Sequence, residues 1–164
     1  MLVSFDSLED SSKIWIYQSN REFSEQEVAE ISNELENFIG AWKRHGEDLK
    51  ASYQIKYNQF IVVAVDENYN EISGCSIDAS VNLMKQFEQK FGIDLTNKLN
   101  ISFKDNNNIN VVSMANFQNY AKLQKITSKT IVFNNMITNK GDFEKNWEVT
   151  ADKSWHKRFL SINN

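Results

Sequence analysis

This sequence has almost no cysteine, no long apolar run and no export signal. Its 164 residues contain one cysteine, so no disulfide can form within the chain. No apolar run approaches the ~18 residues that a membrane-spanning helix needs. The N-terminus also lacks the basic and apolar regions of a signal peptide. We therefore expect a cytoplasmic protein with no membrane partner.

Proline is absent altogether. Loops without proline leave the unfolded chain more conformational freedom to lose, so we expect modest thermal stability. The composition is otherwise that of a globular protein, with 41% hydrophobic and 24% charged residues. The length suits one core, and no linker or repeat divides it. We therefore expect a single domain over residues 1–164.

The motifs that identify many enzymes by their spacing are missing as well. The sequence has no G-x-x-x-x-G-K-[ST] phosphate-binding loop, no G-x-G-x-x-G and no G-x-S-x-G. Its two histidines, His45 and His156, have no neighbouring histidine or cysteine at metal-ligand spacing. We expect no metal and no cofactor, and whether the chain is an enzyme stays open.

Charge is unevenly distributed along the chain, whose net charge is −4. Residues 1–49 hold 11 acidic and 4 basic residues, and residues 50–164 hold 11 acidic and 14 basic residues. Neither part has a dense lysine and arginine cluster interleaved with aromatic residues. A dominant nucleic-acid partner is therefore not expected.

The hydrophobic pattern predicts an α+β fold. The continuous apolar run 60–65 is typical of a central strand that is covered on both faces. Residues 49–67 and residues 99–112 each have the alternation and polar turn of a hairpin. We expect a mostly antiparallel sheet of five or six strands, covered by two long helices and one shorter helix.

The first long helix has the best-marked start in the chain. Ser24 and Glu27 have the spacing of a capping box, and the basic residues 43–45 are expected in the last helical turn, where they suit the helix dipole. Residues 134–160 are predicted to be an irregular, aromatic-rich wrap over the core, with a short helix from about Asp152.

The second long helix is predicted to begin within residues 74–80, Gly-Cys-Ser-Ile-Asp-Ala-Ser, just after the most apolar strand. Apolar residues recur downstream at steps of three and four, which is the period of a single buried stripe. Ser76 or Asp78 is the expected N-cap, and Gly92 is expected to end the helix in the left-handed conformation. The stripe consists of Ile77, Val81, Met84, Phe87 and Phe91.

This helix start is the candidate site, with Cys75, Ser76 and Asp78 from the segment and Asp66 from the end of the central strand. Most free cysteines are small buried hydrophobic residues. A thiol at a helix N-terminus is instead activated as a thiolate, and the free amides there can bind an anion. Cys75 with His45 or His156, and with Asp66 or Asp78 to orient the histidine, would supply the parts of a thiol enzyme. Spacing gives no evidence that they meet.

Three hypotheses for function follow. The first is a binding or interaction module without chemistry, whose partner is an unknown protein. The second is binding of a small anionic ligand at the start of the second helix. The third is a thiol-dependent enzyme or redox sensor that uses Cys75.

Four segments carry a resemblance that extends over the whole chain: residues 15–21 (Trp-Ile-Tyr-Gln-Ser-Asn-Arg), 74–80, 130–135 (Thr-Ile-Val-Phe-Asn-Asn) and 154–156 (Ser-Trp-His). On these segments the chain, end to end, resembles a small uncharacterised bacterial family, whose members are sometimes labelled "ABC transporter ATPase". This sequence does not support that label, because it lacks the phosphate-binding loop and is too short for a full nucleotide-binding domain. The resemblance implies no catalytic residue.

Overall fold

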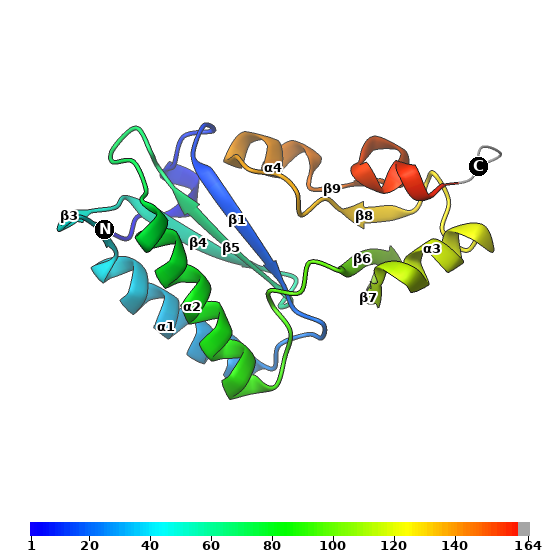
Figure 1. The fold of residues 1–164 in the computed structure, drawn as a ribbon, viewed down its shortest axis with the longest axis horizontal. Helices are drawn as coiled ribbons and strands as arrows, with labels where there is room; N and C mark the ends of the chain where they lie inside the picture. Colours follow the sequence, from blue (N-terminus) through cyan, green and yellow to red (C-terminus); the bar gives the residue numbers. More distant parts are fainter. Residues whose placement is uncertain (161–164) are drawn as a thin grey trace. The chain divides into compact units, whose positions relative to one another are not determined.

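The computed structural model describes residues 1–160, which form helices and antiparallel sheets, so the predicted α+β class is confirmed (Figure 1). The chain divides into two compact units. Unit 1 comprises residues 1–96 and 137–143, and unit 2 comprises residues 97–136 and 144–164. The prediction of one domain stays a prediction, because this division does not decide whether either unit folds alone.

Unit 1 is built on a three-stranded antiparallel sheet with the strand order β1-β5-β4. These strands are β1 (Lys13–Gln18), β4 (Ala51–Lys56) and β5 (Phe60–Val65). All six residues of β5 are buried, because neighbouring strands pair with both of its edges and other elements cover both of its faces. The prediction of a central strand from the apolar run 60–65 is confirmed.

Two long helices, α1 (Glu25–Ala41) and α2 (Gly74–Phe91), pack side by side on one face of this sheet (Figure 1). Every second residue of β5 points to that face, because side chains alternate along a strand. Burial of these side chains against the helices is the main stabilising contribution in unit 1. The buried residues at this contact include Ile31, Leu35, Ile39, Ile61, Val63, Val65, Met84 and Phe87.

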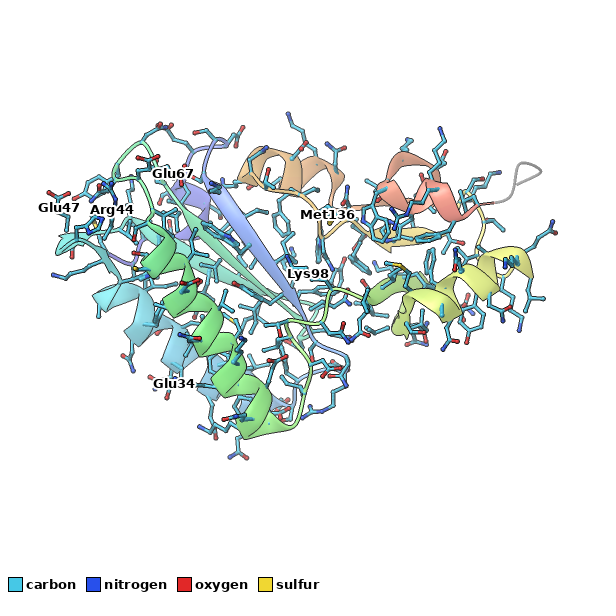
Figure 2. The ribbon with its side chains drawn as sticks, in the orientation of Figure 1. Glu34, Arg44, Glu47, Glu67, Lys98 and Met136 are labelled. Carbon is cyan, nitrogen blue, oxygen red and sulfur yellow. The ribbon has the colours of Figure 1, made fainter. Side chains whose placement is uncertain are left out.

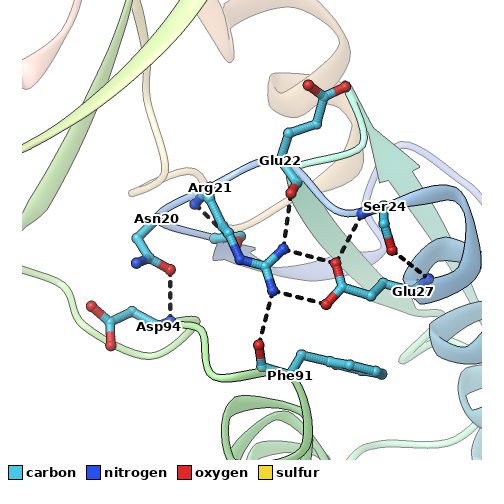
Figure 3. Close-up of polar contacts among 8 residues, drawn as sticks. Asn20, Arg21, Glu22, Ser24, Glu27, Phe91 and Asp94 are labelled. Carbon is cyan, nitrogen blue, oxygen red and sulfur yellow. Dashed lines mark hydrogen bonds and ion pairs between the residues drawn. The ribbon is translucent and has the colours of Figure 1, made fainter.

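The capping box predicted for the first helix is present. The Ser24 side chain accepts a hydrogen bond from the Glu27 amide at 3.1 Å, and the Glu27 carboxylate accepts one from the Ser24 amide at 2.9 Å. Arg21 binds the same carboxylate through both terminal nitrogens, at 2.7 and 2.8 Å. It also donates to the Phe91 carbonyl oxygen at 2.8 Å (Figure 3). One guanidinium therefore joins the start of α1 to the end of α2.

Two short segments distant in sequence also pack on the unit 1 sheet, and residues 137–140 hydrogen-bond along the edge of β1. The first holds the 3₁₀ turn η1 (Phe5–Ser7), and the second is residues 137–143. The rings of Phe5 and Phe143 meet edge to face, 6.2 Å apart. The buried Lys140 ammonium donates to the Leu8 carbonyl oxygen at 2.9 Å. Unit 1 is therefore completed only when the chain returns to it after residue 136.

Unit 2 contains a four-stranded antiparallel sheet with the order β7-β6-β8-β9. These strands are β6 (Asn100–Asp105), β7 (Asn108–Ser113), β8 (Ile131–Phe133) and β9 (Glu148–Thr150), and the helix α3 (Met114–Lys122) follows β7. The tight β6–β7 turn uses Asn106 and Asn107 at φ 51° and 72°, a conformation that asparagine tolerates. The core of the unit includes Ile101, Phe117, Ile126, Val132 and Ala151.

The expectation of one sheet of five or six strands is wrong. Among residues 1–160 there are sheets of three, two and four strands. Alternation predicts that a segment is a strand, but it carries little information about which other strand it joins. Here β1 and β4 pair with the two edges of β5, and the later hairpin β6–β7 pairs with β8 in a separate sheet.

The basic residues 43–45 are not in the last turn of α1, as had been predicted. The helix ends at Ala41 because Trp42 turns to an extended conformation, where its indole nitrogen donates to the Ser76 carbonyl oxygen at 3.0 Å. The next residues form a two-stranded ribbon, β2 (Lys43–Arg44) with β3 (Glu47–Asp48), which turns through His45 and Gly46 at φ 51° and 83°. Arg44 and Glu47 mark it in Figure 2.

Residues 134–160 are more regular than predicted. They contain the helix α4 (Lys140–Asn146), strand β9 and two 3₁₀ turns, η2 (Ala151–Lys153) and η3 (Trp155–Phe159). The predicted short helix near Asp152 corresponds to these turns. Strand β9 was missed because its three residues pair only with β8, which is too short a stretch for alternation to be recognised.

Candidate functional site

The candidate helix start lies in unit 1, and its N-cap is neither Ser76 nor Asp78. Ser73 caps α2, and its side chain accepts a hydrogen bond from the Ser76 amide at 3.2 Å. The helix therefore begins at Gly74, within the predicted residues 74–80 but before either predicted cap, and Cys75 is its second residue. The Cys75 thiol is exposed, so the interpretation of Cys75 as a buried structural residue is wrong. Gly92 ends the helix at φ 62°, as predicted.

The buried stripe of α2 is rotated relative to the prediction. Met84 and Phe87 are buried as expected, but Val81 is only half-buried at the edge of the stripe. The centre of the stripe includes two serines and Leu83, which a purely apolar pattern overlooks. The buried residues of α2 are Ser76, Ser80, Leu83, Met84 and Phe87.

Ser76 is buried, and its hydroxyl is used structurally. It donates to the Lys43 carbonyl oxygen at 2.7 Å and lies 2.9 Å from the Ser73 hydroxyl. The Ser76 carbonyl oxygen accepts from Trp42, as described above. These bonds attach the start of α2 to the segment that follows α1, so Ser76 positions the helix.

The two candidate carboxylates do not share a site in the described contacts. Asp78 is exposed on α2. Asp66 is buried at the end of β5, where it accepts from the Asn68 amide at 3.0 Å and lies 3.7 Å from the Lys50 ammonium. Asp66 thus stabilises the turn after β5, and its bonds do not reach Cys75.

The two histidines belong to different units. His45 lies in the turn of the β2–β3 ribbon in unit 1. His156 is 1% exposed in unit 2, and its Nδ1 lies 2.8 Å from the Ser154 hydroxyl. Burial, together with the nearby Arg158 charge, lowers the pKa of His156 to about 4. His156 is therefore neutral at pH 7.

A different place, wholly within unit 2, combines a pocket with several lysines. It is a pocket with a cavity volume of about 630 Å³, and we call it the lysine pocket. It lies where the β6–β7 turn and the segment between α3 and β8 come together. Its lining includes Phe103, Lys104, Asp105, Asn106, Asn107, Asn110, Tyr120, Lys125 and Lys129.

The cations of the lysine pocket come from separate parts of unit 2. Lys104 lies on β6 and is paired with Glu148 at 3.1 Å. Lys125 and Lys129 lie on the α3–β8 segment, are exposed, and have no salt-bridge partner within residues 1–160. Against three lysines the lining has one carboxylate, Asp105, so the pocket is positively charged overall.

The segment that carries Lys125 and Lys129 is held in place by its own hydrogen bonds. The Tyr120 carbonyl oxygen accepts from the Lys125 amide at 2.9 Å, and the Thr130 hydroxyl accepts from the Thr127 amide at 2.9 Å. The Lys125 ammonium lies 5.9 Å from the centre of the Tyr120 ring. Both cations are thus presented by an ordered turn.

The two units differ in the sign of their charge. Unit 1 has 18 acidic and 9 basic residues, for a net charge of −9, and unit 2 has 4 acidic and 9 basic residues, for a net charge of +5. In unit 1 the acidic residues include Glu34, which projects outward from α1 (Figure 2). In unit 2 the excess of lysine favours anionic ligands.

The lysine pocket was not predicted from the sequence. Its lysines are dispersed over residues 104–129, so no dense basic cluster is visible. Counting charge along the chain also mixed the two units, because residues 137–143 return to unit 1. The signals that were available are the polar turn at Asn106 and Asn107 and the scarcity of acidic residues between positions 97 and 136.

Comparisons with protein-family models, with curated proteins and with solved structures found no match. Within residues 1–160, no group of three or more histidine, cysteine, aspartate or glutamate side chains is arranged to hold a metal ion. No helix in that part of the chain is long and apolar enough to cross a membrane.

Proposed function

We propose that this chain is a binding module that acts without covalent chemistry, and that the lysine pocket of unit 2 binds a small anionic ligand. The observation that carries the proposal is the pocket itself, with Lys125 and Lys129 unpaired beside it. An ammonium group that already has a carboxylate partner gains less from a second anion. Two unpaired ammonium groups on an ordered turn are therefore well suited to an anion with several charges.

The proposal keeps the cytoplasmic location predicted from the sequence. An exposed single thiol suits a reducing compartment. The segments 15–21, 74–80, 130–135 and 154–156 also support membership of the uncharacterised bacterial family that they resemble. We propose that membership as well, and it contributes no ligand and no activity to the argument.

Charge reversal tests the pocket. In the double variant K125E/K129E, we expect the dissociation constant for tripolyphosphate to rise about tenfold or more, because two attractions become repulsions. Isothermal titration calorimetry at low salt and without metal ions measures this constant. The matched control is K122E, which changes the charge of an exposed lysine on α3 outside the pocket lining. The proposal would be contradicted if K122E weakened tripolyphosphate binding as much as K125E/K129E does, or if the unmodified protein did not bind tripolyphosphate.

A thiol function remains the second candidate, because Cys75 is exposed at a helix N-terminus. We expect a thiol reagent such as 5,5′-dithiobis(2-nitrobenzoate) to modify the folded protein with one equivalent before any unfolding. C75S should lose this reaction and retain tripolyphosphate binding. If C75S loses anion binding together with the thiol, the second helix and not the lysine pocket contains the ligand site.

A further inference from the structure

We infer that the ligand of the lysine pocket is a nucleoside phosphate of mononucleotide size. This inference rests on the proposed function and adds the chemical class of the ligand. It combines three features of the pocket: its volume, the aromatic rings in its wall, and the asparagine side chains at its rim. None of these is needed to bind a simple inorganic anion.

The volume exceeds the requirement of phosphate alone. A cavity of about 630 Å³ is in the range of small-molecule sites, roughly 300–1,000 Å³. Inorganic phosphate would fill only a small part of it and leave apolar surface in water. A ligand with an organic ring system as well as phosphates would use the remaining space.

Two aromatic rings line the same pocket as the lysines. Phe103 on β6 and Tyr120 on α3 are both half-buried, and their rings stand nearly perpendicular with centres 6.4 Å apart. Because both rings are only partly covered by the core, a flat base can stack on the exposed part of one of them. The Lys125 ammonium lies 5.9 Å from the Tyr120 ring centre. A cation and a stacking surface are therefore neighbours, as phosphate and base are within one nucleotide.

Asparagine side chains complete the lining. Asn106 and Asn107 are in the β6–β7 turn, and Asn110 follows on β7. Each amide offers two donated hydrogens and an acceptor oxygen, which are the groups needed to contact the polar edge of a base. The chain has no glycine-rich phosphate loop, so the lysines would hold the phosphates in place of backbone amides.

The test compares three probes by calorimetry, all in the presence of EDTA: tripolyphosphate, adenosine and ATP. Tripolyphosphate has at least the charge of ATP, so electrostatics cannot favour ATP. We expect ATP to bind at least fivefold more tightly than tripolyphosphate, and adenosine to bind weakly. The ring substitution Y120L should abolish the advantage of ATP while tripolyphosphate binding is retained, which also shows that the variant is folded. Y120F should keep the advantage.

The outcomes separate the inference from the proposed function. If ATP and GTP bind no better than tripolyphosphate, the inference is wrong and the anion site stands. If none of the probes binds, both are wrong. A single-stranded oligoribonucleotide that binds far more tightly than ATP would also overturn the assignment to a mononucleotide. If the Lys125→Gln and Lys129→Gln variants lose ATP binding while the Lys122→Gln variant binds ATP as the unmodified protein does, the result would support both the anion site and the nucleotide inference.

Discussion

Lowering the pH from 7 to 5 should reduce the free energy of unfolding by about 2 kcal/mol through His156 alone. The folded protein holds this histidine neutral, because burial lowers its pKa to about 4. The unfolded chain has an ordinary histidine pKa of about 6.5. Between pH 6.5 and pH 4 the unfolded chain binds a proton at His156 that the folded protein does not bind. The contribution of His156 to the free energy of unfolding is therefore fully present above about pH 6.5 and decreases as the pH falls toward 4.

The surroundings of His156 explain why a proton is costly there. The ring is stacked on Trp155 with centres 4.1 Å apart and lies against Phe117 at 5.4 Å. Its Nδ1 is near the Ser154 hydroxyl, and no hydrogen-bond partner is found for the buried Nε2 within residues 1–160. A charged imidazolium would therefore be buried among aromatic rings without a counter-ion, a situation that costs several kcal/mol.

Urea unfolding at pH 7, 6 and 5 measures the effect, and tryptophan fluorescence provides a probe beside the histidine. The variant His156→Gln places a neutral group at the same position. Its stability should be lower than that of the unmodified protein at pH 7, yet nearly constant between pH 7 and 5. An unmodified protein that is equally stable at both pH values would show that His156 is not buried as described.

Replacing Arg21 by methionine should destabilise the folded protein by about 2 kcal/mol. The guanidinium makes charge-assisted hydrogen bonds to both oxygens of Glu27 and to the Phe91 carbonyl oxygen. Its own side chain is 44% exposed, so solvent screening reduces the value below the sum of these bonds. R21K should recover only part of the loss, because lysine cannot make the two parallel bonds.

A double-mutant cycle with E27Q isolates the pair, because glutamine can still complete the capping box. We expect the sum of the stability losses in R21M and E27Q to exceed the loss in the double variant by about 1 kcal/mol. The Arg21 hydrogen bonds are also the main reason that the pKa of Glu27 is lowered to about 2. That stability is present above about pH 4.5 and is lost as the pH falls toward 2. If the effects of R21M and E27Q on the free energy of unfolding are additive, the contact between Arg21 and Glu27 shown in Figure 3 does not contribute to stability.

The parts of the fold that could be predicted are those whose signals are local. Three features each depend on a few neighbouring residues, and the structure confirms each at its predicted position. They are the capping box of Ser24 and Glu27, the apolar run of β5, and the end of α2 at Gly92. The hairpins were found too, because polar turns between alternating strands are themselves local. Each of these signals agrees with the fold around it, which is why it can be recognised without knowledge of the tertiary contacts.

The errors occur where a tertiary contact overrides a local preference. Trp42 leaves α1 to bond with Ser76, so the basic residues after it form a ribbon and not a last helical turn. The bond from Ser76 to the Lys43 carbonyl oxygen makes Ser76 part of the core, although its side chain is polar. Neither contact can be deduced from spacing, because the partners are about 34 residues apart.

The candidate site could be predicted only in part. The sequence located Cys75 at a helix start, and the exposed thiol lies there. It did not indicate that Lys104, Lys125 and Lys129 line one pocket, since that depends on how the β6–β7 hairpin and the α3–β8 segment are arranged in unit 2. The sequence predicts anion binding at the start of α2, and that hypothesis stays a prediction beside the lysine pocket.

Backbone amide chemical shifts, followed by NMR as tripolyphosphate is added, test the location of anion binding most directly. The account predicts saturable shifts concentrated at the β6–β7 turn and at Tyr120, Lys125, Ile126 and residues 129–131, which line the lysine pocket. The largest shifts at residues 73–76, where α2 begins, would contradict it and would return the site to the helix start.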